Sequence, residues 1–153
     1  MIAQHMRQQL REAHAEGNYQ SLLALIPYAG LIGIDCAREG EDLRFRLPAN
    51  PDNIGNPLLP AIHGGVIAGF MELSAALYLL IFSESASIPK IIDFSIDYLR
   101  AAHCRDTYAQ CQLWRQGRRV TNVAITAWQG DRNLPIATAR AHFKIEEAHR
   151  PLK

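Results

Sequence analysis

The apolar residues of this chain gather in one long run that carries a single charge. From Val66 to Phe82, leucine, isoleucine, alanine and aromatic residues follow one another without a polar face. A helix that is apolar all round is normally buried on all sides. The run is shorter than the roughly 20 residues of a membrane span and has Glu72 near its centre, which favours a buried helix over a transmembrane one.

The second half of the chain alternates apolar and polar residues with the period of two that is typical of half-buried strands. Short turns separate four such segments, and strands joined by short turns become antiparallel neighbours. The segments are residues 90–99, 107–115, 119–129 and 134–145. In the last of them Ala137, Ala139 and Ala141 share one face, which indicates that a bulky element, such as a helix, packs closely there.

The first sixty residues predict smaller elements. Residues 2–26 are rich in helix-forming side chains with a break near Gly17, and we expect Pro27 to end this segment. Residues 31–37 predict a short strand and residues 43–47 a half-buried strand. The proline, asparagine and glycine residues of 48–60 predict a loop.

These elements predict an α+β domain in which an antiparallel sheet packs on one long central helix. We interpret residues 1–153 as a single domain, with residues 1–26 as an N-terminal helical extension. One sheet cannot enclose a helix that is apolar on every side, so the far side of the helix needs another cover. A second copy of the chain is the simplest supplier, and we expect a homodimer.

Composition and charge exclude several kinds of partner. The chain is 48% hydrophobic and 20% charged with a net charge of +1, which gives no general attraction to nucleic acid or to an anionic membrane. The three cysteines are scattered and match no metal-site spacing, so we predict no metal ion. Reduced cysteines and the lack of a secretory-signal pattern predict a cytoplasmic protein.

Glu72 points most directly to chemistry. A buried carboxylate is costly unless it is neutral, paired or functional, and no lysine or arginine lies three or four positions away on the helix. Gly64 and Gly65 begin the helix and present free amides at the positive end of its dipole, where a developing oxyanion can bind. Two simpler interpretations stay open. Glu72 could face a polar patch at a subunit interface, and the two glycines could serve only to make a tight turn from the loop into the helix.

The spacing of Gly64 and Glu72 decides how they could act together. Eight positions separate them, which corresponds to about 12 Å along a helix. Both cannot contact one carbonyl group within one chain. Two helices that lie antiparallel about a two-fold axis would bring Gly64 of one chain to Glu72 of the other, twice over. The sequence therefore predicts a dimer with two composite sites.

Four segments carry a family resemblance. They are LIGIDCAREGEDLRFRLPANPDNIGNP at 31–57, HGGVIAGFMELSAA at 63–76, DFSIDYLRAAHCRD at 93–106 and RQGRRVTNVAITAWQGDRNLPIATARAHFKI at 115–145. They resemble the hotdog-fold thioesterases, specifically the phenylacetate-degradation type of acyl-CoA thioesterase, and the likeness covers nearly everything after about Ile26. The resemblance implies a sheet wrapped around the helix, an obligate dimer that is often paired into a tetramer, and hydrolysis of an acyl-CoA thioester. No cofactor is implied, because coenzyme A is part of the substrate.

The resemblance also implies roles for residues of the motif. Glu72 would activate water or attack the thioester carbon. The amide of Gly64, aided by Gly65, would hold the thioester oxygen. His63 would shape the loop and hydrogen-bond near the thioester, although a purely structural role for His63 stays open.

Two positions depart from the family pattern. The family usually has an asparagine or glutamine six residues before the histidine of the motif, where this chain has Pro57, and Asn56 is the candidate to take over this role. Many members carry a serine or threonine four residues after the acid, where this chain has Ala76. Ser74 points elsewhere, about 200° around the helix from Glu72.

Substrate-binding residues follow partly from the resemblance and partly from chemistry. The phosphates of coenzyme A need cations, and the resemblance places Arg100, Arg118 and Arg119 where the nucleotide would dock. Ordinary solvated turn charges remain an alternative for these arginines. Phe70 and Leu73 are candidates to line an apolar acyl or aryl pocket.

Two other functions remain open at this point. A non-catalytic acyl-CoA binding or sensing protein is one, and Pro57 and Ala76 favour it. An acyl-thioester dehydratase or hydratase on the same fold is the other, although the position of His63 before the two glycines favours the thioesterase arrangement. The sequence leaves open the acyl group, the pathway and the choice between dimer and tetramer.

Overall fold

The computed structural model describes residues 2–82 and 88–145. The last eight residues of the predicted single domain, 146–153, lie outside the described residues. The helices are α1 (Ile2–Glu16), α2 (Gln20–Leu23), α3 (Pro27–Ile32) and α4 (Gly64–Phe82), with a short 3-10 turn at Pro51–Asn53. The strands are β1 (Asp35–Glu39), β2 (Asp42–Leu47), β3 (Ile54–Asn56), β4 (Ala61–Ile62), β5 (Lys90–Tyr98), β6 (Thr107–Gln116), β7 (Val120–Trp128) and β8 (Ala137–Lys144).

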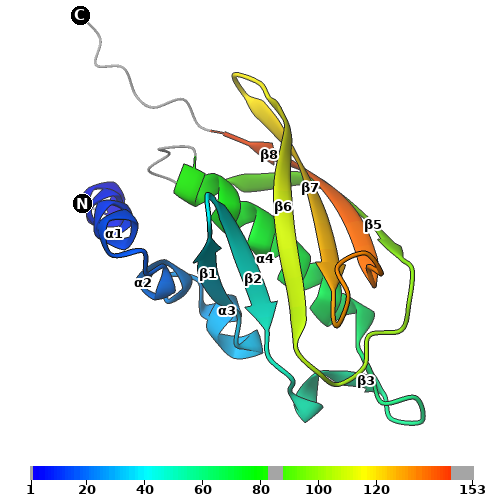
Figure 1. Ribbon diagram of the computed structural model, residues 1–153. Coiled ribbons are helices and arrows are strands. Elements are labelled where there is room, and N and C mark those ends of the chain that lie inside the picture. The colour runs from blue at the N-terminus through cyan, green and yellow to red at the C-terminus, as the bar shows by residue number, and fades with distance from the viewer. Residues whose placement is uncertain (1, 83–87, 146–153) are drawn as a thin grey trace, which may run out of the picture.

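Six of the strands form one antiparallel sheet that curves around α4 (Figure 1). Their order is β1-β2-β6-β7-β8-β5, and every neighbouring pair is antiparallel. The four alternating segments of the second half became β5 to β8, as predicted. The α+β class and the hotdog arrangement of sheet and central helix are confirmed.

The core lies between the sheet and α4. Ala137, Ala139 and Ala141 of β8 are buried on the inner face, which confirms the prediction from their alternation. Their small side chains let the helix approach the sheet, and Phe70 and Met71 of α4 are completely buried. Burial of such large apolar side chains stabilises the fold by about 1.5–3 kcal/mol each.

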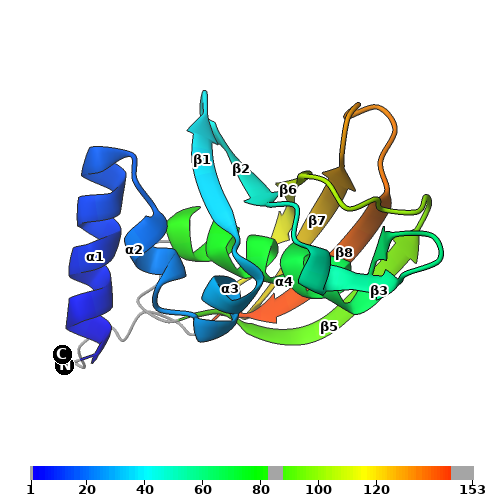
Figure 2. The same ribbon diagram turned by 90° about the horizontal axis from the view of Figure 1, so that it is seen from below.

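The N-terminal helices cover part of α4, which the sequence analysis did not foresee. Figure 2 shows α1 and α2 beside the end of α4 that leads to Phe82, whereas α3 lies farther along α4 toward its start. Leu10 of α1 lies with Leu80 and Ile81 along one cavity, and the Nε2 atom of His14 bonds the carbonyl oxygen of Ile81 at 2.8 Å. The C-terminal half of α4 therefore has a cover within its own chain.

The first half of α4 keeps an open stripe. Gly65 is exposed, and Ala68, Gly69, Glu72 and Leu73 are half-buried. These positions follow the i, i+3, i+4, i+7 and i+8 spacing of one helical face. By length and composition, α4 is apolar enough to cross a membrane. However, 56% of its most apolar stretch is buried inside this structure, as is typical of a core helix. If the predicted second copy of the chain binds here, its contact with α4 falls on this open stripe.

Two predictions for the N-terminal third were wrong in detail. Residues 27–32 form α3, so residues 31 and 32 of the predicted strand are helical. Pro27 opens this helix at its first turn, where a missing amide costs nothing. Gly33 then ends α3 with a left-handed φ of 75°, and β1 starts only at Asp35. Residues 48–60 are not all loop, since they contain the 3-10 turn and β3, and β3 pairs with β4 directly after them as a small antiparallel hairpin.

Candidate active site

A cavity of about 430 Å³ lies at the start of α4. Gly64 and Ile67 of α4 line it from one side, and Tyr98 and Arg100 line it from the end of β5 and the loop that follows. The site therefore lies between the glycine motif and the end of β5, which forms one edge of the sheet. Among residues 2–82 and 88–145, no three His, Cys, Asp or Glu side chains gather closely enough to hold a metal ion.

His63 holds the start of α4 in place. Its backbone amide donates to the carbonyl oxygen of Asn53 at 2.8 Å, and its Nδ1 atom accepts a hydrogen bond from the amide of Gly65 at 2.9 Å. Because Nδ1 accepts, the ring is free to carry a proton on Nε2. Gly55 of β3 packs directly on His63, since a Cβ atom at position 55 would lie 2.7 Å from the His63 Cα atom.

Gly64 offers the free amide of the site. Its carbonyl oxygen accepts a hydrogen bond of 2.7 Å from the Tyr98 hydroxyl, and the Tyr98 ring lies where a Cβ atom would approach within 3.2 Å. In the described part of the chain, the Gly64 amide has no acceptor, whereas the Gly65 amide is taken up by His63. The Gly64 amide thus stands at the positive end of the helix dipole, ready for an oxyanion or a carbonyl oxygen.

Tyr98 is a site residue that sequence reasoning missed, although the signal was present. The inward row of β5 runs through Phe94 and Ile96, and Tyr98 continues it at the end of the strand. From that position the Tyr98 hydroxyl reaches the start of α4, while 54% of the residue stays exposed to solvent. The alternation of inward and outward residues along β5 would have identified Tyr98.

Asn56 lies in β3, opposite Ala61 of β4. Its Oδ1 atom accepts a hydrogen bond of 3.1 Å from the amide of Leu58, which orients the side chain at the tip of the hairpin. Within the described residues its amide NH₂ group makes no hydrogen bond, so it remains able to donate to a ligand. The hairpin leads directly into His63, which places Asn56 on the glycine side of the site.

Glu72 is half-buried on the open stripe of α4. It lies two helical turns beyond the glycines, so one chain does not bring its carboxylate to the Gly64 amide. Ser74 is fully buried, and its hydroxyl donates to the carbonyl oxygen of Phe70 at 2.7 Å. Ala76 is buried as well, so the helix itself presents no hydroxyl close to Glu72 on this face.

The predicted binding residues fall into two groups. Arg100 lies beside the cavity and donates from Nη1 to the carbonyl oxygen of Pro135 at 2.7 Å. Arg118 and Arg119 are exposed in the β6–β7 turn, at the end of the molecule opposite the start of α4 (Figure 1). Phe70 is fully buried in the core, and Leu73 is half-buried on the open stripe.

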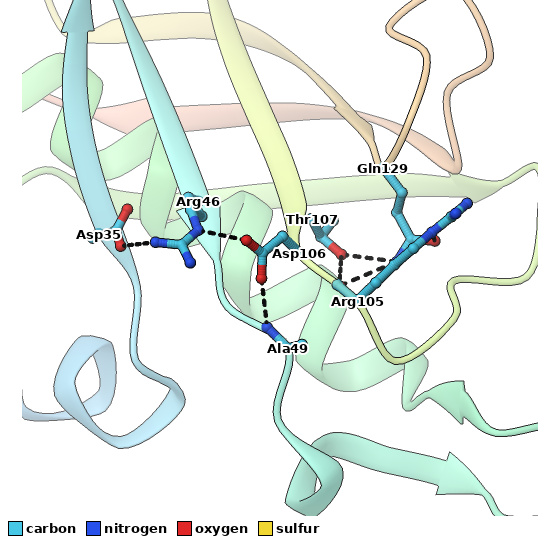
Figure 3. A network of polar contacts seen from close by, with 7 residues as sticks. All are labelled: Asp35, Arg46, Ala49, Arg105, Asp106, Thr107 and Gln129. Atoms are coloured by element: carbon cyan, nitrogen blue, oxygen red, sulfur yellow. Dashed lines mark hydrogen bonds and ion pairs between the residues drawn. The ribbon is translucent and has the colours of Figure 1, made fainter.

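The loop that carries Arg100 is anchored by Gln129 at the end of β7 (Figure 3). The Gln129 side chain is buried and reaches across to His103, Arg105 and Thr107. Ala102 of the same loop accepts a hydrogen bond of 2.7 Å from the amide of Ile62, the residue before His63. A lone glutamine at a strand end gives no sequence signal for such a role.

A second group of polar contacts joins the strands beside this loop (Figure 3). Arg46 of β2 bonds Asp35 of β1 and Asp106, each at 2.9 Å. The amide of Ala49 also donates to Asp106 at 2.9 Å. The Ala49 amide and the Arg46 guanidinium hold the pKa of Asp106 below its ordinary value.

Comparisons with known proteins show the family to which the chain belongs. The model of the thioesterase superfamily matches residues 59–136. The medium/long-chain acyl-CoA thioesterase YigI of Escherichia coli is 28% identical over 134 residues, which cover 78% of this chain and 86% of YigI. A solved protein from Chromobacterium violaceum is 40% identical with a TM-score of 0.74, covering 93% of this chain and 99% of its own. A phenylacetic acid degradation-related protein from Ralstonia eutropha shares the fold at 21% identity with a TM-score of 0.71, covering 83% of this chain and 98% of its own.

Proposed function

Because the chain belongs to the thioesterase superfamily and is a thioester hydrolase, we propose that it hydrolyses an acyl-CoA at a site shared between two copies of the chain. The activity of YigI supports the coenzyme A substrate. The observation that carries the shared site is the distance within one chain. The Gly64 amide is open, and Glu72 lies about 12 Å away along the same helix.

The proposed reaction assigns one task to each side of the site. Glu72 of one chain takes a proton from water, and the resulting hydroxide attacks the thioester carbon. The Gly64 amide of the second chain, with Asn56 as a further donor, stabilises the oxyanion that develops on the thioester oxygen. The C–S bond then breaks, and Glu72 returns its proton to the thiolate of coenzyme A, which leaves as the thiol. The products are a carboxylic acid and free coenzyme A.

The edge of the sheet supports a two-fold pairing. Within residues 2–82 and 88–145, β5 is an outer strand that pairs with β8 alone, and Ile92 on it is 56% exposed. An open strand edge with apolar side chains is a ready surface for pairing with another chain. Two copies joined through β5 would place their α4 helices antiparallel, with the open stripes facing each other. Each Glu72 would then approach the partner's glycine motif.

The same arrangement offers a place for the rest of the substrate. Arg100 lies beside the cavity, and the partner's β6–β7 turn with Arg118 and Arg119 would lie at the same end of the dimer. Guanidinium groups suit the phosphates of coenzyme A. Leu73, on the open stripe, is a candidate for contact with an apolar acyl group, whereas Phe70 is completely buried and belongs to the core. We place the reaction in the cytoplasm, where acyl-CoA is made and used.

The activity is tested with a panel of short, long and aryl acyl-CoAs and a thiol-detecting reagent. We expect thiol release with at least one of them, and a loss of about 100-fold or more in kcat for Glu72→Gln. Thiol release by Glu72→Gln at the wild-type rate would refute the assigned base. Absence of release from every acyl-CoA would refute the substrate class.

The shared site is tested by complementation. Gly64→Pro removes the amide hydrogen at a helix position that tolerates proline, and Gly64→Ala is the matched control that adds a Cβ atom but keeps the amide. We expect Glu72→Gln and Gly64→Pro each to be inactive alone. After dissociation and reassembly as a mixture, half of the dimers carry one intact site out of two, so about a quarter of the wild-type activity returns. A site built within one chain would regain nothing.

A further inference from the structure

Tyr28 of α3 lies directly against the helix that carries Glu72. A Cβ atom built at Gly69 of α4 would be 2.8 Å from the Tyr28 hydroxyl oxygen and 3.0 Å from its Cε1 atom. Only glycine permits this contact without a shift of the ring. Glycine within a helix is less favourable than alanine by about 1 kcal/mol, so Gly69 is a position where close approach outweighs helix propensity.

The contact with Gly69 places the Tyr28 hydroxyl about one helical turn before Glu72. Residues three apart on a helix are surface neighbours, with about 5–6 Å between their Cβ atoms. Helical side chains also lean toward the N-terminus, so the patch covered by a residue lies over the turn before it. The side chain of Glu72 therefore extends over Gly69, where the Tyr28 hydroxyl rests.

The Tyr28 hydroxyl is free to serve a ligand. Tyr28 is 42% exposed, and among the described residues its hydroxyl makes no hydrogen bond. By contrast, the Tyr98 hydroxyl is occupied by the carbonyl oxygen of Gly64. The face of α4 around Glu72 presents no hydroxyl of its own, because Ala76 follows one turn later and Ser74 is turned into the core.

We propose that Tyr28 is a further catalytic residue, whose hydroxyl holds the attacking water together with Glu72. Glu72 accepts one hydrogen of the water and the Tyr28 oxygen accepts the other, so that a lone pair of the water oxygen points to the thioester carbon. The proton moves to Glu72 during attack, and Tyr28 keeps its own proton throughout. This inference rests on the proposed thioesterase function and adds α3 to the active site.

The test uses Tyr28→Phe, which keeps the ring against Gly69 and removes only the hydroxyl. We expect kcat to fall about 10- to 100-fold, below the range of a general base, with KM and the thermal midpoint unchanged. Tyr108→Phe is the matched control, because Tyr108 lies on the outer side of the sheet with its ring near Trp128. Its kcat should stay at the wild-type value.

A second variant separates the hydroxyl from the packing of the ring. Gly69→Ala pushes the Tyr28 hydroxyl away from its place, so it should lower kcat to a similar extent. Adding Tyr28→Phe to Gly69→Ala should then cause little further loss, since the hydroxyl is already displaced.

The outcomes distinguish this inference from the function beneath it. An active wild type in which Glu72→Gln is impaired but Tyr28→Phe stays within twofold of wild type overturns the role of Tyr28 alone. A wild type that releases no thiol from any acyl-CoA overturns both. Fully additive losses in the double variant would show that Tyr28 and Gly69 act independently, which also contradicts the proposal.

Discussion

Replacement of Gln129 should loosen the loop that carries Arg100, and the structure allows the effect to be estimated. The Gln129 Oε1 atom accepts from the His103 amide at 3.1 Å and from Arg105 Nε at 3.2 Å. Its Nε2 atom donates to the His103 carbonyl oxygen at 2.8 Å and to the Thr107 hydroxyl at 3.1 Å. Each such bond contributes about 0.5–1.5 kcal/mol net, and a buried group left without a partner costs about 1–3 kcal/mol.

Arg105 is exposed and can turn to water, so three bonds decide the magnitude. We expect Gln129→Ala to lower the free energy of unfolding by about 2–4 kcal/mol. For a chain of this size that corresponds to a fall of roughly 4–16 °C in the thermal midpoint. Because the loop lines the cavity, KM for acyl-CoA should rise as well.

Denaturant unfolding and steady-state kinetics measure the two effects. Gln112→Ala is the control, since Gln112 is exposed on β6. Gln129→Glu refines the test, because a carboxylate keeps the acceptor but loses the bonds that Nε2 donates and buries a charge, so it should destabilise at least as much as alanine at neutral pH. If Gln129→Ala matched the Gln112→Ala control in both stability and KM, Gln129 would not be the anchor of the loop.

Two further substitutions test the supports of the site. Gly55→Ala places a methyl group 2.7 Å from the His63 Cα atom, so we expect a loss of about 1–3 kcal/mol in unfolding free energy. We also expect kcat to fall, and thermal scans and thiol release measure the two effects. Asp106→Asn removes a carboxylate whose pKa is lowered first by the Ala49 amide and then by Arg46. A lowered pKa stabilises the fold above the ordinary carboxyl pKa and is lost as the pH falls through the folded value, so wild type and Asp106→Asn should differ at neutral pH and converge below about pH 4 in denaturant unfolding. A difference that stayed constant with pH would show that the Asp106 charge is not involved.

The sequence predicted the elements whose pattern is local. The alternation through Phe94 and Ile96 is enough to predict β5, and the alanines of β8 revealed on which side the helix packs. The α3 helix was missed because proline both ends and begins helices, and nothing local distinguishes the two roles at Pro27. The β3–β4 hairpin was missed because the prolines and glycine around it are typical of loops.

Contacts between distant segments explain why the site was predicted only in part. The glycine motif and Glu72 stand out in the sequence, since their residue types contrast with their neighbours. Tyr28 and Tyr98 do not stand out, because each acts on a glycine that lies 30 or more positions away in the chain. Only the fold shows that these tyrosines and the glycine motif belong to one surface.

The first half of α4 contains three glycines, and each admits a polar ring from elsewhere. The pairs are Gly64 with Tyr98, Gly65 with His63 and Gly69 with Tyr28. The helix must stay apolar to pack on the sheet, and Glu72 is its one charged side chain, so the other polar groups of the site have to approach it from outside.

Three separate glycine-to-alanine substitutions should then act differently. The change at 65 should disturb the motif through His63, the change at 64 should loosen the Tyr98 bond, and the change at 69 should act through Tyr28. A single shared effect on helix stability would instead give three equal losses in unfolding free energy with kcat unchanged, which would contradict these assignments.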